Sequence, residues 1–233
     1  LDLSRVLLLS IMYPIYRILL PLVLFLICVI QSFAATGADI GFFEGQVDVD
    51  HFNCLKTNGL EFIILQALRS IGEFHEDVLV NFPNAKQVFT DVDLYIFPCP
   101  VQGMDPVTNA VQILLDNGYN DGNMIWIDVE QTGSCYYDDV SKNVDYFHEV
   151  MDYLSEVWTG CGLETCAGIY TSSSQWTPIT GCSTEFSDYQ LWWPRYTTIS
   201  NPWSPFCGWE NYNIWQYAGD YQLCGLDLDM NRY

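Results

Sequence analysis

The feature that most constrains the fold of this chain is a repeated alternation of two kinds of segment. Eight short segments rich in β-branched and aromatic residues are predicted as strands, at 38–43, 62–68, 93–97, 124–130, 167–171, 189–196, 213–217 and 226–233. Segments with helical spacing separate the first five of them, at 48–58, 75–89, 105–117 and 138–158. After the fifth strand the helical signal fades to a short turn at 173–176.

Alternating strands and helices predict a parallel sheet whose functional residues lie at the carboxyl ends of its strands. Eight such strands suggest closure into a barrel. Because the helices weaken after the fifth strand, we expect an irregular barrel with helices mainly after the first four or five strands. The predicted fold is therefore an α/β barrel, formed by a single catalytic domain over residues 36–233.

The charge balance excludes one class of partner. The chain has 8 Lys and Arg residues against 29 Asp and Glu, which gives a formal net charge of -21. Such a chain repels nucleic-acid phosphates, so no nucleic-acid partner is expected. An acidic composition can also accompany disorder, but the 8 Trp, 15 Tyr and 13 Phe residues indicate a folded core.

The first residues have the composition of a targeting segment. An apolar run at 18–30 follows Arg17 and precedes Ser32-Phe33-Ala34, which places small residues where a signal peptidase reads them. We expect residues 1–35 to be a signal peptide, with Met12 as an alternative start, and no stable membrane association after its removal. A membrane anchor is the other interpretation, but the run is short for a span of ~20 residues. The expected location is outside the cell, or in the lumen of a lysosome or phagosome.

Cysteine usage agrees with secretion. Cys28 lies within the predicted signal peptide, and eight cysteines remain, at positions 54, 99, 135, 161, 166, 182, 207 and 224. An even number in a secreted chain predicts up to four disulfides, whose pairing the sequence leaves open. A zinc site at Cys161 and Cys166 would need further close cysteines or a nearby histidine, which the sequence lacks, so no metal is predicted.

The sharpest chemical signal is the predicted strand Ile-Trp-Ile-Asp-Val-Glu at 125–130. Because strand side chains alternate, Asp128 and Glu130 share one face at its carboxyl end. A pair of carboxylates is what glycosidic cleavage uses, one as an acid and one as an anion. The alternative is that both residues belong to a loop that caps the next segment. The sequence has no serine-nucleophile elbow, phosphate loop or dinucleotide motif, and no cofactor is expected.

Aromatic residues cluster along the later predicted strands. Pyranose rings stack on aromatic side chains, and a polar neighbour such as Gln216 can bind sugar hydroxyls. About half of these rings are expected to belong to the core instead. The predicted substrate-binding residues are Tyr95, Tyr170, Trp193, Tyr196, Trp215, Gln216 and Tyr217.

Seven ordered motifs resemble glycoside hydrolase family 25, the lysozyme family with an Asp-x-Glu pair, and particularly its secreted, eukaryotic, cysteine-containing branch. The likeness extends from about residue 37 to residue 233. It is carried by GADIG at 37–41, LYIFPCP at 94–100, IDVE at 127–130, GIYT at 168–171, LWWPRY at 191–196, WQY at 215–217 and LDMN at 228–231. Gly41 departs from the family, which usually has Ser at that position.

The resemblance implies a flattened, irregular β/α barrel that hydrolyses the bond between N-acetylmuramic acid and N-acetylglucosamine in bacterial peptidoglycan. By motif position, Glu130 would be the general acid. Asp128 would assist a substrate whose own 2-acetamido group takes part in the displacement, and Asp39 and Asp229 would complete an acidic cluster. The protein is expected to be a monomer that serves in antibacterial defence or digestion.

Two other functions stay open on sequence alone. A chitinase-like hydrolase would carry Asp-Gly-x-Asp-x-Asp-x-Glu, but Trp126 stands where that motif needs its central Asp. A catalytically inactive relative would bind glycans as a lectin-like module. Such a module would have no reason to keep four mutually repelling carboxylates.

Overall fold

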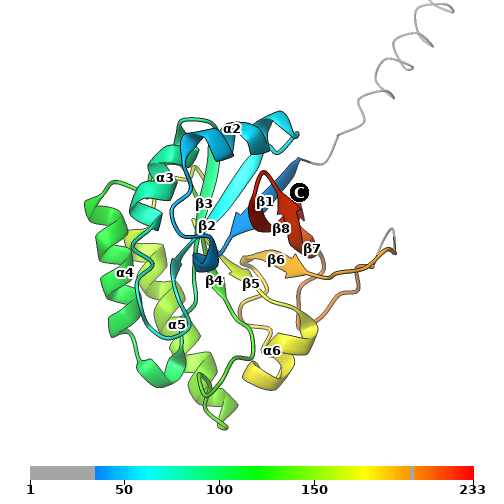
Figure 1. Cartoon of the computed structure of the whole chain (residues 1–233). Helices are drawn as coiled ribbons and strands as arrows, with labels where there is room; N and C mark the ends of the chain where they lie inside the picture. Colours follow the sequence, from blue (N-terminus) through cyan, green and yellow to red (C-terminus); the bar gives the residue numbers. More distant parts are fainter. Residues whose placement is uncertain (1–34, 200–201) are drawn as a thin grey trace, which may run out of the picture. The chain divides into compact units, whose positions relative to one another are not determined.

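The computed structural model describes residues 35–199 and 202–233, so the predicted signal peptide lies outside the described residues except for Ala35. Strands and helices alternate through the first two thirds of the described chain, and strands dominate the rest (Figure 1). In chain order the elements are β1 (Thr36–Ile40), η1 (Phe42–Glu44), α2 (Val49–Thr57), β2 (Phe62–Leu68), α3 (Val78–Lys86), β3 (Asp91–Ile96), η2 (Pro100–Gln102), α4 (Asp105–Asp116), β4 (Ile125–Asp128), α5 (Val140–Val157), β5 (Ala167–Tyr170), α6 (Ser173–Thr180), β6 (Gln190–Pro194), β7 (Ile214–Leu223) and β8 (Leu226–Arg232).

The eight strands close into a barrel in the order of the sequence, which confirms the predicted fold class. Each neighbouring pair from β1–β2 to β6–β7 is parallel. The prediction of a parallel sheet is wrong for β8, which is antiparallel to both β7 and β1. The cause is local: Cys224 and Gly225 both adopt positive φ and turn β7 directly into β8, and a tight hairpin reverses the strand direction.

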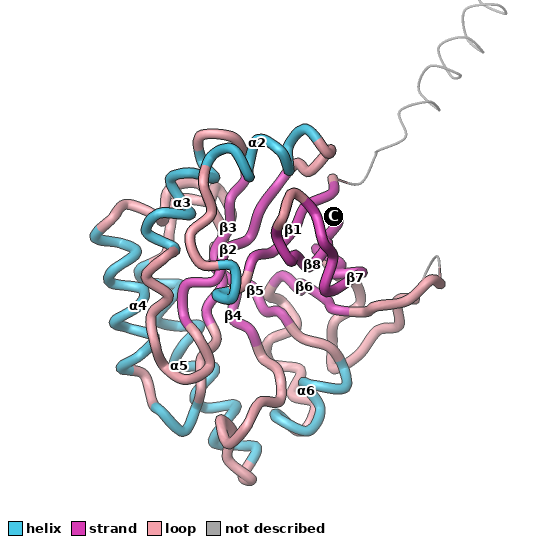
Figure 2. The backbone as a smooth tube through the Cα atoms, viewed as in Figure 1, coloured by secondary structure: helices cyan, strands magenta, loops and turns pink. Residues whose placement is uncertain are grey.

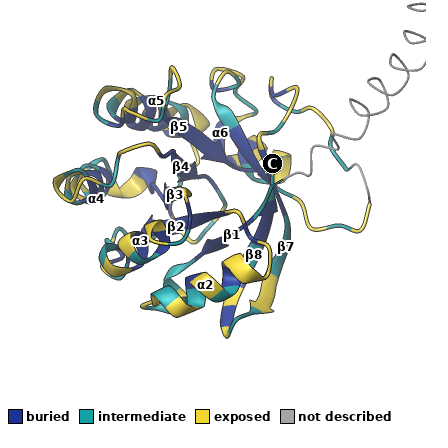
Figure 3. Ribbon diagram, turned by 90° about the horizontal axis from the view of Figure 1, so that it is seen from above, coloured by how far each residue is buried: buried dark blue, intermediate teal, exposed yellow. Residues whose placement is uncertain are grey.

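Helices cover only part of the barrel. Helices α2 to α5 surround the side formed by β1 to β5, with buried strands at the centre (Figures 2 and 3). Between β6 and β7 the described residues form loops, and aromatic side chains pack there instead of a helix. The ring of Trp193 in β6 lies 5.4 Å from Tyr212 and 4.9 Å from Trp203.

Strand side chains alternate between two clusters. One, called the outer core, lies between the strands and the surrounding helices and loops, and the other lies inside the barrel. In β4, Ile125 and Ile127 belong to the outer core, whereas Trp126 belongs to an inner cluster with Tyr95 and Trp192. This alternation decides which predicted site residues face the mouth of the barrel.

A buried carboxyl group lies inside the barrel towards the amino ends of the strands. Asp93, in β3, accepts hydrogen bonds from Trp126 Nε1 (3.0 Å) and from the backbone N–H of Met124 (2.9 Å). Burial raises the pKa of Asp93 to about 6, although both donors act to lower it. Strands β3 and β4 are thereby joined by a group that titrates within the physiological pH range.

Some element boundaries differ from the prediction. Helix α6 forms where only a turn was expected, because its Ser-rich, Pro178-containing sequence has low helix propensity. The buried ring of Trp176 lies 5.9 Å from Phe147 and 5.2 Å from Trp209, and burial of such a ring stabilises the helix by about 2–3 kcal/mol. Strand β7 also extends six residues beyond the predicted end at 217, and β4 ends at Asp128 rather than at Glu130.

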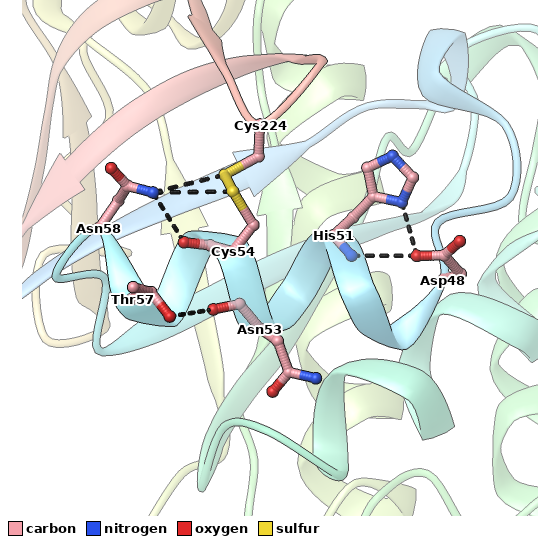
Figure 4. The surroundings of a disulfide bond; sticks show 7 residues. All are labelled: Asp48, His51, Asn53, Cys54, Thr57, Asn58 and Cys224. Carbon is pink, nitrogen blue, oxygen red and sulfur yellow. Dashed lines mark hydrogen bonds and ion pairs between the residues drawn. A yellow bond between two sulfur atoms is a disulfide. The ribbon is translucent and has the colours of Figure 1, made fainter.

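Four disulfides pair the eight cysteines, as their even number predicted: Cys54–Cys224, Cys99–Cys135, Cys161–Cys166 and Cys182–Cys207. The first ties helix α2 to the turn between β7 and β8 (Figure 4). In the described part of the chain, no helix is long and apolar enough to cross a membrane.

Candidate active site

The four predicted carboxylates come from three strands and one loop. Asp39 in β1 lies directly opposite Asp229 in β8, because the antiparallel register pairs the two residues. Asp128 is the last residue of β4, and Glu130 follows two positions later. The charges of Glu130 and Asp39 both act on Asp128, and that of Asp229 acts on both Asp39 and Glu130, so the structure brings the four together.

Gln216 in β7 holds this cluster in place. Its side-chain oxygen accepts hydrogen bonds from the hydroxyls of Tyr170 (2.8 Å) and Tyr196 (2.7 Å). Its side-chain nitrogen donates to the Oδ2 atoms of Asp39 (2.8 Å) and Asp229 (3.4 Å). Because two tyrosine hydroxyls occupy its oxygen, the amide nitrogen must face the two carboxylates.

Burial shifts the titration of the whole cluster. Loss of solvation, reinforced by the charge of Asp229, raises the pKa of Asp39 to about 8, although Asn231 donates to its Oδ2 at 2.7 Å. Burial and the charge of Glu130 raise the pKa of Asp128 well above its usual range. The pKa of Glu130 is also raised, first by burial and then by the charge of Asp229. The mouth of the barrel therefore retains protons near neutral pH, on a group of carboxyls that titrate together.

Two polar atoms beside this cluster are buried and have no hydrogen-bond partner among the described residues. One is Oδ1 of Asp128, and the other is the hydroxyl of Tyr136, in the loop after β4. Buried polar atoms are normally paired, so these two atoms are exceptions among the residues around the cluster.

Two hollows open at the cluster. One of about 350 Å³ is lined by Asp39, Asp229 and Tyr95, together with residues of η1 and of the β7–β8 hairpin. The other, of about 220 Å³, is lined by Glu130 and by residues of β5, α6 and the segment after β6. A chain-like substrate could therefore lie across the mouth with a carboxylate on each side of it.

The predicted substrate-binding residues divide into two groups. Tyr95, Tyr170 and Gln216 face the barrel interior, and Tyr196 lies at the rim, where its hydroxyl also contacts Asp229 (3.3 Å). All four line the hollows or bind the carboxylate cluster.

The other three residues, Trp193, Trp215 and Tyr217, belong to the outer core, because their strand neighbours Trp192 and Gln216 occupy the inward positions. Trp215 donates its Nε1 hydrogen to the carbonyl of Arg195 and lies 4.0 Å from the guanidinium of Arg232. Tyr217 lies beside the same guanidinium. Trp193 also borders a hollow of about 390 Å³ that adjoins the one at Glu130.

Sequence reasoning missed several polar residues that support the site. Asn231 donates to Asp39 and accepts from Trp192 Nε1 (2.7 Å), and alternation in LDMN could have placed it beside Asp229. Tyr136 lies in a loop, where no periodic pattern indicates which way a side chain faces. Within the described ranges, no group of three or more His, Cys, Asp or Glu side chains is arranged to hold a metal ion.

Comparisons with known proteins agree with this arrangement. A family model described as Lysozyme-like protein 1 matches residues 32–217. The Probable GH family 25 lysozyme 2 of Dictyostelium discoideum is 34% identical over 206 residues, which are 86% of this chain and 91% of that protein. Counting factor 50 of the same organism is 31% identical over 193 residues, or 78% of this chain and 60% of that protein.

A solved structure of a family GH25 lysozyme from Aspergillus fumigatus shares the fold. It matches with a TM-score of 0.68 at 20% identity and covers 86% of this chain and 93% of that one. The family model, the Dictyostelium lysozyme relative and the common fold together show that this chain belongs to the glycoside hydrolase family 25 lysozymes.

Proposed function

We propose that the protein hydrolyses the β-1,4 bond between N-acetylmuramic acid and N-acetylglucosamine in bacterial peptidoglycan. The observation that carries this proposal is the cluster of buried carboxyls with raised pKa values between two hollows at the barrel mouth. Glycosidic cleavage needs a carboxyl that holds its proton and a second carboxyl that stabilises positive charge on the sugar.

Glu130 is the proposed general acid. It is only partly buried and lines the smaller hollow, so a glycosidic oxygen can approach it. Proton transfer from Glu130 to that oxygen releases the leaving sugar, while the carbonyl oxygen of the substrate's 2-acetamido group attacks the anomeric carbon. Water then opens the cyclic intermediate and returns a proton to Glu130.

Asp128 is proposed to assist this displacement. Its Oδ1 atom has no partner among the described residues, so it is free to accept the N–H of the acetamido group. That hydrogen bond orients the amide for attack on the anomeric carbon. Asp229, fixed by Gln216, contributes charge that helps Glu130 to keep its proton.

Replacement of the proposed acid tests this assignment. Glu130→Gln is expected to lower the release of reducing ends from purified bacterial wall by at least ~10²-fold, because the side chain can no longer supply a proton. The same variant should still bind wall fragments. Glu164→Gln, an exposed change in the loop before β5, is the control and should keep full activity.

Three outcomes of this assay discriminate between functions. Near-normal activity of folded Glu130→Gln would contradict the catalytic assignment. Faster cleavage of chitin than of bacterial wall would favour the chitinase-like alternative. Wall binding without any hydrolysis by the unmodified protein would indicate a binding module.

The proposed setting is extracellular, or the lumen of a lysosome or phagosome, in antibacterial defence or digestion. Four disulfides support an oxidising compartment. The raised pKa of Glu130 supports activity on the acidic side of neutrality, because a general acid must be protonated to act.

A further inference from the structure

The larger hollow at the barrel mouth, called here the acidic hollow, contains more carboxylates than the proposed hydrolysis uses. In addition to Asp39 and Asp229 it is lined by Glu44 of η1, Asp220 of β7 and Asp227 of β8. None of its lining residues is basic. Arg69 lies against the ring of Phe42, and its guanidinium forms an ion pair with Glu73 (2.7 Å) outside the hollow.

The hydroxyl of Tyr95, a buried residue that lines the acidic hollow, also has no partner among the described residues. Tyr95 is 9% exposed and lines the hollow, and its hydroxyl makes no hydrogen bond to a residue that the structure describes. Gly41 leaves this hydroxyl open, since a Cβ atom there would lie 3.7 Å from it and 3.8 Å from Gln66 Oε1. The base of the hollow is therefore open to a ligand that can hydrogen-bond with these oxygens.

The rim of the acidic hollow carries an exposed ring. Phe43 is 85% exposed, although its neighbour Phe42 is partly buried and packs against it at 3.8 Å. Both rings line the hollow. An exposed aromatic ring beside oxygen acceptors is suited to the apolar face of a sugar, because such rings stack on pyranoses.

From these observations we infer that the acidic hollow binds a protonated primary amine carried by the wall substrate. This inference rests on the proposed function, and it names a chemical feature of the preferred substrate. The amine belongs either to a glucosamine unit that lacks its acetyl group or to the side chain of a peptide stem.

The physical reason is charge compensation. An ammonium group has three hydrogen-bond donors and no acceptor, which matches a site made of carboxylates, a hydroxyl and an amide oxygen. A neutral N-acetylated sugar would offer no positive charge to the carboxylates of the hollow. No three of the described acidic or histidine side chains are arranged to hold a metal ion, so an organic cation fits the hollow better than a metal does.

The test compares four soluble wall fragments of equal length. One is fully acetylated without stems, and one is de-N-acetylated at its glucosamine units. The third carries stems with a free amine, and the fourth carries the same stems with that amine acetylated. The unmodified protein is expected to show a KM at least about fivefold lower for one amine-bearing fragment than for its acetylated counterpart, which identifies the source of the amine.

Variants locate the effect in the acidic hollow. Glu44→Gln combined with Asp227→Asn should reduce this ratio of KM values to near one, since a carboxylate that is exposed or only partly buried contributes about two- to fivefold. Glu164→Gln, at the opposite end of the barrel, should keep the ratio. Added salt should also reduce the preference, because it screens attraction between exposed charges.

Failure of this inference is distinguishable from failure of the proposed function. Equal KM values for amine-bearing and acetylated fragments would overturn the amine site while hydrolysis stands. Cleavage of none of the fragments would overturn the hydrolase assignment, and dissociation constants for the same four fragments would then decide the amine site. If the ratio of KM values is the same in the Glu44→Gln, Asp227→Asn double variant, the amine binds elsewhere, and the inference that the acidic hollow binds it is wrong.

Discussion

At the scale of single residues, the amide of Gln216 determines how the carboxyls of the site titrate. It is 2% exposed, and it joins two tyrosine hydroxyls to two carboxylates from the first and last strands. Gln216→Leu removes all four hydrogen bonds at similar volume. Because Asp39 then loses a donor that stabilises its charged form, its pKa should rise above about 8.

The same substitution should lower the free energy of unfolding by about 1–3 kcal/mol, since buried partners are left unpaired. Carbon-detected NMR titration of the aspartates and the pH profile of kcat/KM measure the first effect, and urea unfolding measures the second. Gln112→Leu, on the exposed face of α4, is the matched control. An unchanged Asp39 titration in Gln216→Leu would show that Gln216 does not position the cluster.

Single residues of the site could be predicted where strand alternation or the position of a motif applied; Glu130 and Tyr196 lie beyond the ends of β4 and β6 and were predicted from their motifs. Asp39, Asp128 and Asp229 lie on strands at the carboxylate cluster, as their motifs implied. Trp193 was predicted to bind substrate, whereas the ring of Trp192 is the one inside the barrel. The two adjacent tryptophans make the phase of the strand ambiguous, and only pairing with neighbouring strands resolves it.

At the scale of secondary-structure elements, the Cys54–Cys224 disulfide connects the β7–β8 hairpin to helix α2. Its cysteines are 170 positions apart, whereas those of Cys161–Cys166 are 5 apart. A cross-link restricts the unfolded chain more when it closes a longer loop. Cys54→Ser with Cys224→Ser should therefore lower the free energy of unfolding by about 5 kcal/mol, against about 2 kcal/mol for Cys161→Ser with Cys166→Ser.

Urea unfolding of the two double variants under non-reducing conditions provides the comparison. The first variant should also lose more activity, because the hairpin carries Asp229 and lines the mouth. Equal losses of stability would show that the entropy of the unfolded chain does not decide how much each disulfide contributes.

Most elements could be predicted because each has its own local pattern. The amphipathic stripe of α5 and the Pro-start of α4 are visible without tertiary information. The antiparallel direction of β8 could not be predicted from alternation, because it depends on Cys224 adopting a positive φ that only a few residue types favour. Helix α6 was missed because contacts of Trp176 with distant residues stabilise it.

At the scale of the whole molecule, buried carboxyl groups make folding depend on pH. Asp93 and Asp39 have folded pKa values raised to about 6 and about 8, above their ordinary 3.8. The folded state therefore binds more protons than the unfolded state. The stabilisation is complete below pH 3.8 and is lost as the pH rises through 6 for Asp93 and through 8 for Asp39.

We consequently expect the free energy of unfolding to fall between pH 5 and pH 8. Asp93 alone accounts for a change of about 1.4 kcal/mol in this range, which is about half of its effect over the whole titration. Urea unfolding at several pH values measures the slope, and Asp93→Asn should reduce it, whatever its effect on absolute stability. Carboxyls whose pKa is lowered, such as Asp48 and Glu185, are exposed and titrate below this window. Stability that rises from pH 5 to pH 8 would contradict the expectation.

The antiparallel pairing of β8 with β1 has a consequence for biosynthesis. Asp39 and its hydrogen-bond donor Asn231 are 192 positions apart, so the ribosome must translate almost the whole described chain before they can meet. Until then one edge of β1 has no partner, and an unpaired strand edge invites association with other chains. The nascent protein also lacks Asp229 until β8 has been synthesised, so the acidic cluster is incomplete before that point. Closure of the barrel and assembly of the site are thus a single event that must follow the synthesis of β8.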